Sequence, residues 1–136
     1  MPKFSQSSLD KLKTVHQDLQ VVFNEVIKHR DITITDGLRT TKQQQALYAQ
    51  GRTEEGNIVT NADGVNSKSN HQSGNAVDVV SYPSMWSDED ELRSLGNFVL
   101  GVAAVLKRYD AIENDIEWGG NWSFTDLPHF QIKTNN

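Results

Sequence analysis

The apolar residues of this 136-residue chain follow two patterns, one typical of helices and one typical of strands. The order in which these patterns occur constrains the fold more than any other feature. Apolar residues recur at helical spacing in residues 9–27 and again in residues 92–106. Short stretches rich in β-branched or aromatic residues predict strands at residues 31–36, 76–80, 116–118 and 129–133. This order favours an α+β fold, in which helices pack on one small, mostly antiparallel sheet.

The boundaries of the predicted helices follow from caps and glycines. We expect the first helix to run without interruption from a cap at Ser7 or Ser8 to about His29. A second helix should end at Gly51, and the polar stretch from there to Asn70 predicts a long loop of the kind that often has a function. The inner side of the last helix is predicted to consist of Leu92, Leu95, Phe98, Val99, Val102, Val105 and Leu106.

Composition limits the possible partners. The length suits one domain, and 36% hydrophobic with 23% charged residues is typical of a globular protein. A net charge of -5 with scattered basic residues argues against nucleic acid as a partner. No apolar stretch is long enough to span a bilayer, and we expect no stable membrane association. Because the chain has no cysteine, any metal must be held by His, Asp or Glu. The first residues lack the pattern of a secretory signal, so we expect synthesis in the cytoplasm.

Three residues far apart in the sequence have the chemistry of a divided zinc site. His71 and Asp78 flank a turn at Gly74, and His129 begins the last predicted strand. Two imidazoles and a carboxylate are a typical ligand set for catalytic zinc, which keeps a further position open for water. Pairing of the strands that contain Asp78 and His129 would bring the three side chains together. Spacing alone also allows His71 to be a polar loop residue, Asp78 a turn residue and His129 a structural residue.

Two further side chains fit hydrolytic chemistry. Asp126 precedes His129 by three residues, across a turn that contains Pro128, and could accept a proton from water. Arg39 follows the first predicted strand and could stabilise an oxyanion or hold a carboxylate. The alternatives are a turn residue for Asp126 and a surface ion pair for Arg39.

Aromatic residues gather in the second half of the chain. Trp86, Trp118, Trp122 and Phe124 could form a rim that binds a glycopeptide. They could equally anchor the core and the loops.

Taken together, these motifs resemble the M15 family of zinc-dependent peptidoglycan peptidases. The segments that carry the resemblance are Gly37-Leu38-Arg39-Thr40, Gln44 to Tyr48, Gly51-Arg52-Thr53, Ser69 to Asp78, Trp118-Gly119-Gly120 and Asp126 to Phe130. They occur in the family's order and cover most of the chain. The branch that this chain resembles most is that of the L-alanyl-D-glutamate endopeptidases, which includes phage endolysins.

The resemblance implies both a fold and a set of roles. The fold would be that of the hedgehog signalling domain and the D,D-peptidases. His71, Asp78 and His129 would bind Zn²⁺, with Ser69 supporting the site from behind. Asp126 would be the catalytic acid and base, and its being Asp rather than Glu favours the endopeptidase branch.

The expected function is therefore zinc-dependent hydrolysis of a peptide bond in the peptidoglycan stem. We expect residues 1–136 to form a single catalytic peptidase domain without a separate wall-binding domain, acting as a monomer. As an endolysin, it would be made in the host cytoplasm and would reach the wall after the membrane is permeabilised. The alternatives are a D,D-carboxypeptidase of the same fold, a non-catalytic wall-binding module and a zinc-free structural protein.

Overall fold

A computed structural model, which describes residues 2–133, contains four α-helices and one four-stranded antiparallel sheet within those residues. The helices are α1 (Gln6–Leu12), α2 (Gln17–Val26), α3 (Thr41–Ala49) and α4 (Glu89–Arg108). The strands are β1 (Ile32–Asp36), β2 (Ala76–Ser81), β3 (Ile116–Trp118) and β4 (His129–Ile132). Two short 3₁₀ helices are η1 (Asn70–Ser73) and η2 (Gly119–Asn121). The predicted α+β fold is confirmed.

The sheet has the order β1-β2-β4-β3, so the two central strands come from distant parts of the sequence. Successive side chains of a strand point to opposite faces. Val77 and Val79 of β2, with Phe130 and Ile132 of β4, belong to the hydrophobic core. Asp78 and His129 therefore lie on the other face, and they are paired directly in the register of the two strands.

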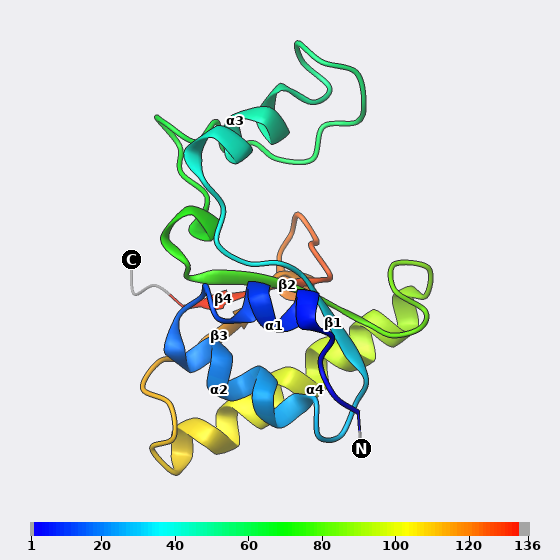
Figure 1. Ribbon diagram of the computed structural model, residues 1–136, viewed down its shortest axis with the longest axis vertical. Coiled ribbons are helices and arrows are strands. Elements are labelled where there is room, and N and C mark those ends of the chain that lie inside the picture. Colours follow the sequence, from blue (N-terminus) through cyan, green and yellow to red (C-terminus); the bar gives the residue numbers. More distant parts are fainter. Residues whose placement is uncertain (1, 134–136) are drawn as a thin grey trace.

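Helices α2 and α4 lie together on the core face of the sheet (Figure 1). On the opposite side, α3 and the loop that follows it stand away from the sheet (Figure 1). The loop contains no helix or strand between Gly51 and Ser69, as its composition predicts. The polar face of the sheet thus lies beneath this projecting segment.

The prediction of one continuous first helix is wrong. The helix breaks between Leu12 and Gln17, because the backbone N–H of His16 donates to the carbonyl of Gly74, 2.8 Å away. The Nδ1 atom of His16 then accepts from the N–H of Asp18 and caps α2. The break lets this part of the chain contact the turn that carries His71.

The predicted cap of the first helix is also wrong. Ser5 is the N-cap of α1, since its side chain accepts from the N–H of Ser8. The Ser8 hydroxyl is buried and accepts from the N–H of Ile34 in β1. It therefore joins α1 to the edge of the sheet.

The last helix is placed almost as predicted. Asp88 caps α4, and most of the expected inner residues pack on the core. Val105 is the exception, because its side chain is 57% exposed. Within residues 2–133, no helix has the length and apolar character needed to cross a membrane.

Candidate metal centre

His71 is held in η1 by a cap and by a backbone carbonyl. The side chain of Ser69 accepts from the N–H of His71, and Gln72 completes the capping box. Gly74 ends the turn at a φ of 77°, a conformation that favours glycine. The Nδ1–H of His71 donates to the carbonyl of Gly37, 2.9 Å away. Because a carbonyl only accepts, this contact places the proton on Nδ1 and leaves Nε2 free.

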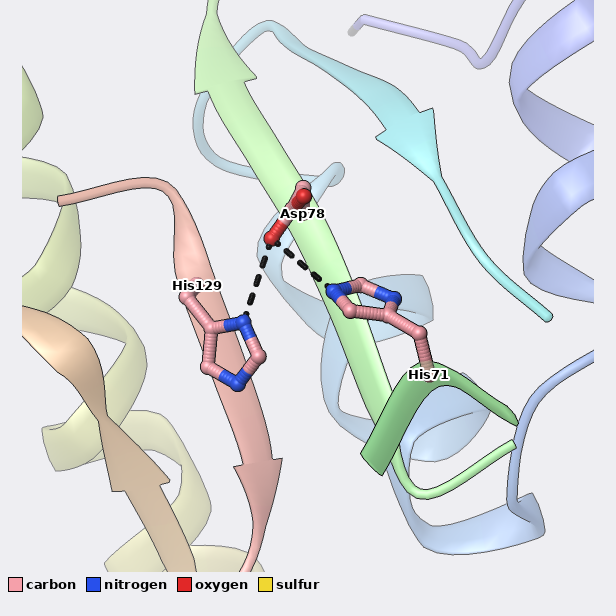
Figure 2. Close-up of side chains that lie close together, drawn as sticks. All are labelled: His71, Asp78 and His129. Carbon is pink, nitrogen blue, oxygen red and sulfur yellow. Dashed lines mark ion pairs between the residues drawn. The ribbon is translucent and has the colours of Figure 1, made fainter. Parts of the chain in front are cut away.

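The two imidazoles converge on one carboxylate oxygen (Figure 2). The Nε2 atom of His71 and the Nδ1 atom of His129 each lie 3.4 Å from Oδ1 of Asp78. One ligand atom from each residue lies within 4.8 Å of the others, so the structure brings together the three predicted ligands. They come from η1, β2 and β4, and pairing of β2 with β4 supplies the contact between Asp78 and His129.

The chemistry of this cluster fits a cation. Among the described residues, Oδ1 of Asp78 is buried and has no hydrogen-bond partner. A buried polar atom without a partner costs free energy, and a metal ion shared with the two ring nitrogens would remove that cost. Two imidazoles and one carboxylate suit zinc, and such a set leaves a coordination position for water or substrate.

The ionisation of the cluster also suits a cation. Burial raises the pKa of Asp78, but the adjacent imidazoles of His129 and His71 outweigh burial and hold that pKa well below the usual carboxyl range. Burial lowers the pKa of His129, and the contacts with Asp78 and Gln131 outweigh it, so the pKa of His129 is raised. The carboxylate of Asp78 thus stays ionised and attracts positive charge to the two rings, either as a proton on a ring in the metal-free site or as a cation that displaces this proton.

Asp126 lies at the edge of the cluster. Its Oδ2 is 3.8 Å from Nδ1 of His129, and its side chain is 43% exposed. Burial, followed by repulsion from Asp78, raises the pKa of Asp126 above its ordinary value. Its backbone N–H donates to the carbonyl of Gly119, and a Cβ on that glycine would lie 2.4 Å from the Asp126 carbonyl oxygen. The glycine therefore permits the close approach that places Asp126 beside the ligands.

Arg39 is fixed at the other side of the cluster. Its guanidinium forms an ion pair with Asp36 and donates to Oε1 of Gln44. Gln44 is completely buried, and its amide donates in turn to Thr60 and to the Ala62 carbonyl of the long loop. The side chain of Arg39 in this ion pair is only 11% exposed. Through Gln44 it is connected to the loop above the sheet.

A cleft of about 820 Å³ joins these groups. It is lined by the three ligands, Asp126 and Arg39, and also by the aromatic side chains Trp86, Trp122 and Phe124. Trp118, the fourth aromatic residue considered for the rim, lies elsewhere.

Trp118 belongs to the core and not to the rim of the cleft. It is 3% exposed, and its Nε1–H donates to the carbonyl of Leu127. A Cβ on Gly96 or Gly120 would lie 2.1 Å from its ring. The two glycines therefore make room for the indole, and of the two hypotheses for this tryptophan the core anchor is the one confirmed.

Comparison with known families identifies the family of this chain. The family model described as phage L-alanyl-D-glutamate peptidase matches residues 1–135. The chain belongs to this family. The family resemblance predicted from the sequence motifs is therefore confirmed.

Two relatives of this phage-peptidase family member are informative. The peptidoglycan L-alanyl-D-glutamate endopeptidase CwlK of Bacillus subtilis (strain 168) is 37% identical over 111 residues, which cover 77% of this chain and 62% of that protein. This chain therefore matches less than two thirds of the length of CwlK. The L-Ala D-Glu endopeptidase ChiX of Serratia marcescens has a similar fold, with a TM-score of 0.67 at 24% identity over 96% of this chain and 90% of that one.

Sequence reasoning missed the polar residues behind the ligands in this family member. Gln131 lies beside His129 and contacts both Asn70 and Glu117, and the Gly37 carbonyl fixes His71. One signal was present for Gln131: it lies two residues from His129 on a strand and hence on the same face. The other contacts depend on which elements meet in space.

Proposed function

We propose that this chain is a zinc-dependent peptidase that hydrolyses the bond between L-alanine and D-glutamate in the peptide stem of peptidoglycan. The observation that carries the proposal is the convergence of His71, Asp78 and His129 in a cleft of a chain from this family. The printed activities of CwlK and ChiX name the same bond and support the choice of substrate. The core draws on residues from Leu12 to Ile132, which supports residues 1–136 as one catalytic domain.

In this proposal His71, Asp78 and His129 hold the zinc ion. Ser69 supports them, because its side chain caps the turn that carries His71. Zinc in such a site polarises the scissile carbonyl and lowers the pKa of water to about 7, which makes a nucleophile available near neutral pH.

Asp126 and Arg39 have separate roles in the reaction. The carboxylate of Asp126 accepts the proton of the attacking water and later gives it to the leaving amine of D-glutamate. The raised pKa of Asp126 suits a group that must both take and return a proton. Arg39, held by Asp36 and Gln44, lines the cleft and would stabilise the negative charge that develops on the carbonyl oxygen.

We further propose that the protein acts as a phage endolysin. The family's description names phage peptidases, and this supports the proposal. The enzyme would be made in the host cytoplasm and would act on the wall after the membrane is permeabilised. Because the proposed ligands, Asp126 and Arg39 all come from one chain, we propose that a monomer is sufficient.

Digestion of purified peptidoglycan tests the bond that is cleaved. After incubation with the zinc-loaded protein, mass spectrometry of the muropeptides should show stems cut after L-alanine, with a new amino terminus on D-glutamate. Loss of terminal D-alanine would instead identify a D,D-carboxypeptidase, and intact muropeptides would contradict hydrolysis altogether.

A cell-based assay tests the endolysin proposal separately. Permeabilised Gram-negative cells should lose turbidity when the protein is added, and a chelator should prevent the loss. Added zinc should restore the lytic activity, so that turbidity falls again. A protein that cuts purified muropeptides yet leaves permeabilised cells intact would argue against the lytic role alone.

A further inference from the structure

The amide of Gln131 lies behind His129 and is almost completely buried. Its Oε1 lies 2.8 Å from Nε2 of His129 and accepts from Nδ2 of Asn70 at 2.9 Å. Its Nε2 donates to Oε1 of Glu117 at 3.0 Å. Every polar atom of this side chain therefore has a partner.

The acidic partner determines which way the amide faces. An ionised carboxylate can only accept hydrogen bonds, so Glu117 requires the NH₂ group of Gln131 on its side. The carbonyl oxygen of the amide must then face His129 and Asn70. The register supports this arrangement, because Glu117 and Gln131 are direct partners in the pairing of β3 with β4.

The direction of the amide in turn determines the state of the imidazole. An amide oxygen can only accept, so the 2.8 Å contact with Gln131 requires a proton on Nε2 of His129. Oδ1 of Asp78 is also an acceptor, but at 3.4 Å from Nδ1 it lies beyond a normal hydrogen bond, so the neutral ring keeps its proton on Nε2. Its Nδ1 then has a free lone pair, and this is the nitrogen that lies 3.4 Å from Asp78. With the opposite tautomer, Nδ1–H would face Asp78 across 3.4 Å and block the metal position, and the bare Nε2 would lie 2.8 Å from an oxygen that can only accept.

The same oxygen joins the two segments that carry the histidines. Asn70 directly precedes His71 in η1, while Gln131 and His129 lie on β4. By accepting from both Asn70 and His129, Gln131 fixes the turn and the strand relative to each other.

We propose that Gln131, directed by Glu117, is a positioning residue for the metal centre, which holds His129 in the Nε2–H tautomer and so leaves Nδ1 free to bind zinc. The part of the proposal that concerns zinc rests on the proposed function. The part that concerns the tautomer rests on the contacts alone.

Three variants separate this role from a merely structural one. Gln131→Leu removes the acceptor, and Glu117→Gln removes the group that directs the amide. The double change Glu117→Gln with Gln131→Glu exchanges acid and amide but keeps an acceptor next to His129. Gln20→Leu is the matched control, since the Gln20 amide donates to the Val15 carbonyl and does not line the cleft.

Nitrogen NMR of the zinc-free protein, at a pH where the rings are neutral, reports which nitrogen of His129 is protonated. We expect Nε2–H in the parent, the double variant and the control, and a shift toward Nδ1–H in Gln131→Leu and Glu117→Gln. Zinc affinity from chelator competition should fall about 10- to 100-fold in these two single variants, as is typical for residues that orient metal ligands. Circular dichroism identifies any variant that fails to fold, and the other single variant then carries the test.

The outcomes distinguish this proposal from the proposed function. An Nδ1–H tautomer in the parent, or unchanged tautomer and zinc affinity in both single variants, would overturn the positioning role even if peptidoglycan is cleaved. If the tautomer responds as expected and the chain cleaves no peptidoglycan, the positioning of His129 is supported and the proposed function fails.

Discussion

The two imidazoles of the candidate centre present different ring nitrogens to Asp78. His71 uses Nε2, because its Nδ1–H donates to the Gly37 carbonyl, whereas His129 uses Nδ1, because its Nε2 faces Gln131. Each ring is therefore fixed by an acceptor on the side away from the carboxylate. The sequence motifs identify the two histidines but do not contain this difference, since it arises from partners on other elements.

The side chain of Asp126 is the most direct test of the proposed chemistry. In Asp126→Ala the three proposed ligands are untouched, so zinc content should stay the same. Loss of the proton acceptor should lower kcat by about 10²- to 10⁴-fold, the usual contribution of general acid–base catalysis. Elemental analysis and a muropeptide assay measure the two effects. Turnover near the parent rate would remove Asp126 from the mechanism.

Among the secondary-structure elements, η2 is important for the site because it supports the backbone of Asp126. Gly119→Ala would place a Cβ 2.4 Å from the Asp126 carbonyl oxygen and 2.9 Å from its Cβ. The segment must shift, and a misplacement of about 1 Å in a catalytic group can cost roughly 100-fold in rate. We therefore expect kcat to fall strongly while zinc affinity changes little.

The matched control for this substitution is Gly101→Ala in α4. A Cβ at Gly101 meets nothing within 4 Å, and alanine is favoured over glycine inside a helix. This variant should keep full activity. Equal rates for the two variants would contradict the supporting role of Gly119.

Asp18 joins α2 to the segment that follows α4. Its Oδ2 accepts from the backbone N–H groups of Glu113 and Asn114 and from the Asn114 amide. Burial raises the pKa of Asp18, but these hydrogen bonds outweigh burial, so the folded-state pKa lies below the ordinary value of 3.8. Loss of a buried acceptor typically costs about 1–3 kcal/mol, and we expect this loss of unfolding free energy for Asp18→Ala near neutral pH.

The pH dependence of this contribution has a definite sign. Because folding lowers the pKa of Asp18, its contribution is complete above the unfolded-state value of 3.8 and is lost as pH falls through the folded-state pKa. The stability difference between the parent and Asp18→Ala should therefore shrink only at acid pH. Urea unfolding of zinc-free protein over that range measures it, with Asp31→Ala at an exposed site as the control. A difference that stays constant at acid pH would argue against the ionised acceptor.

Across the whole molecule, prediction from sequence succeeded where hydrophobic periodicity determines the structure. The apolar residues that alternate with Asp78 in β2 and with His129 in β4 belong to the core, so these two side chains share the opposite face, where Ala76 and Val80 are also buried. The break after Leu12 could not be predicted in this way, because His16 is held by the Gly74 carbonyl, 58 residues further along the chain. Contacts between elements, such as that of Gln131 with Asn70, could not be predicted either, because the two partners lie far apart in the sequence.

Zinc should stabilise the entire fold, because its proposed ligands connect η1, β2 and β4. A ligand that binds only the folded state adds about 4 kcal/mol at 1,000 times its Kd. We expect zinc to raise the Tm of the metal-free protein and a chelator to reverse the rise. His71→Ala should abolish most of this response, whereas Asp126→Ala should retain it. Calorimetry of the three proteins, with and without zinc, separates binding from catalysis, and an equal zinc-dependent Tm shift in His71→Ala would exclude that histidine as a ligand.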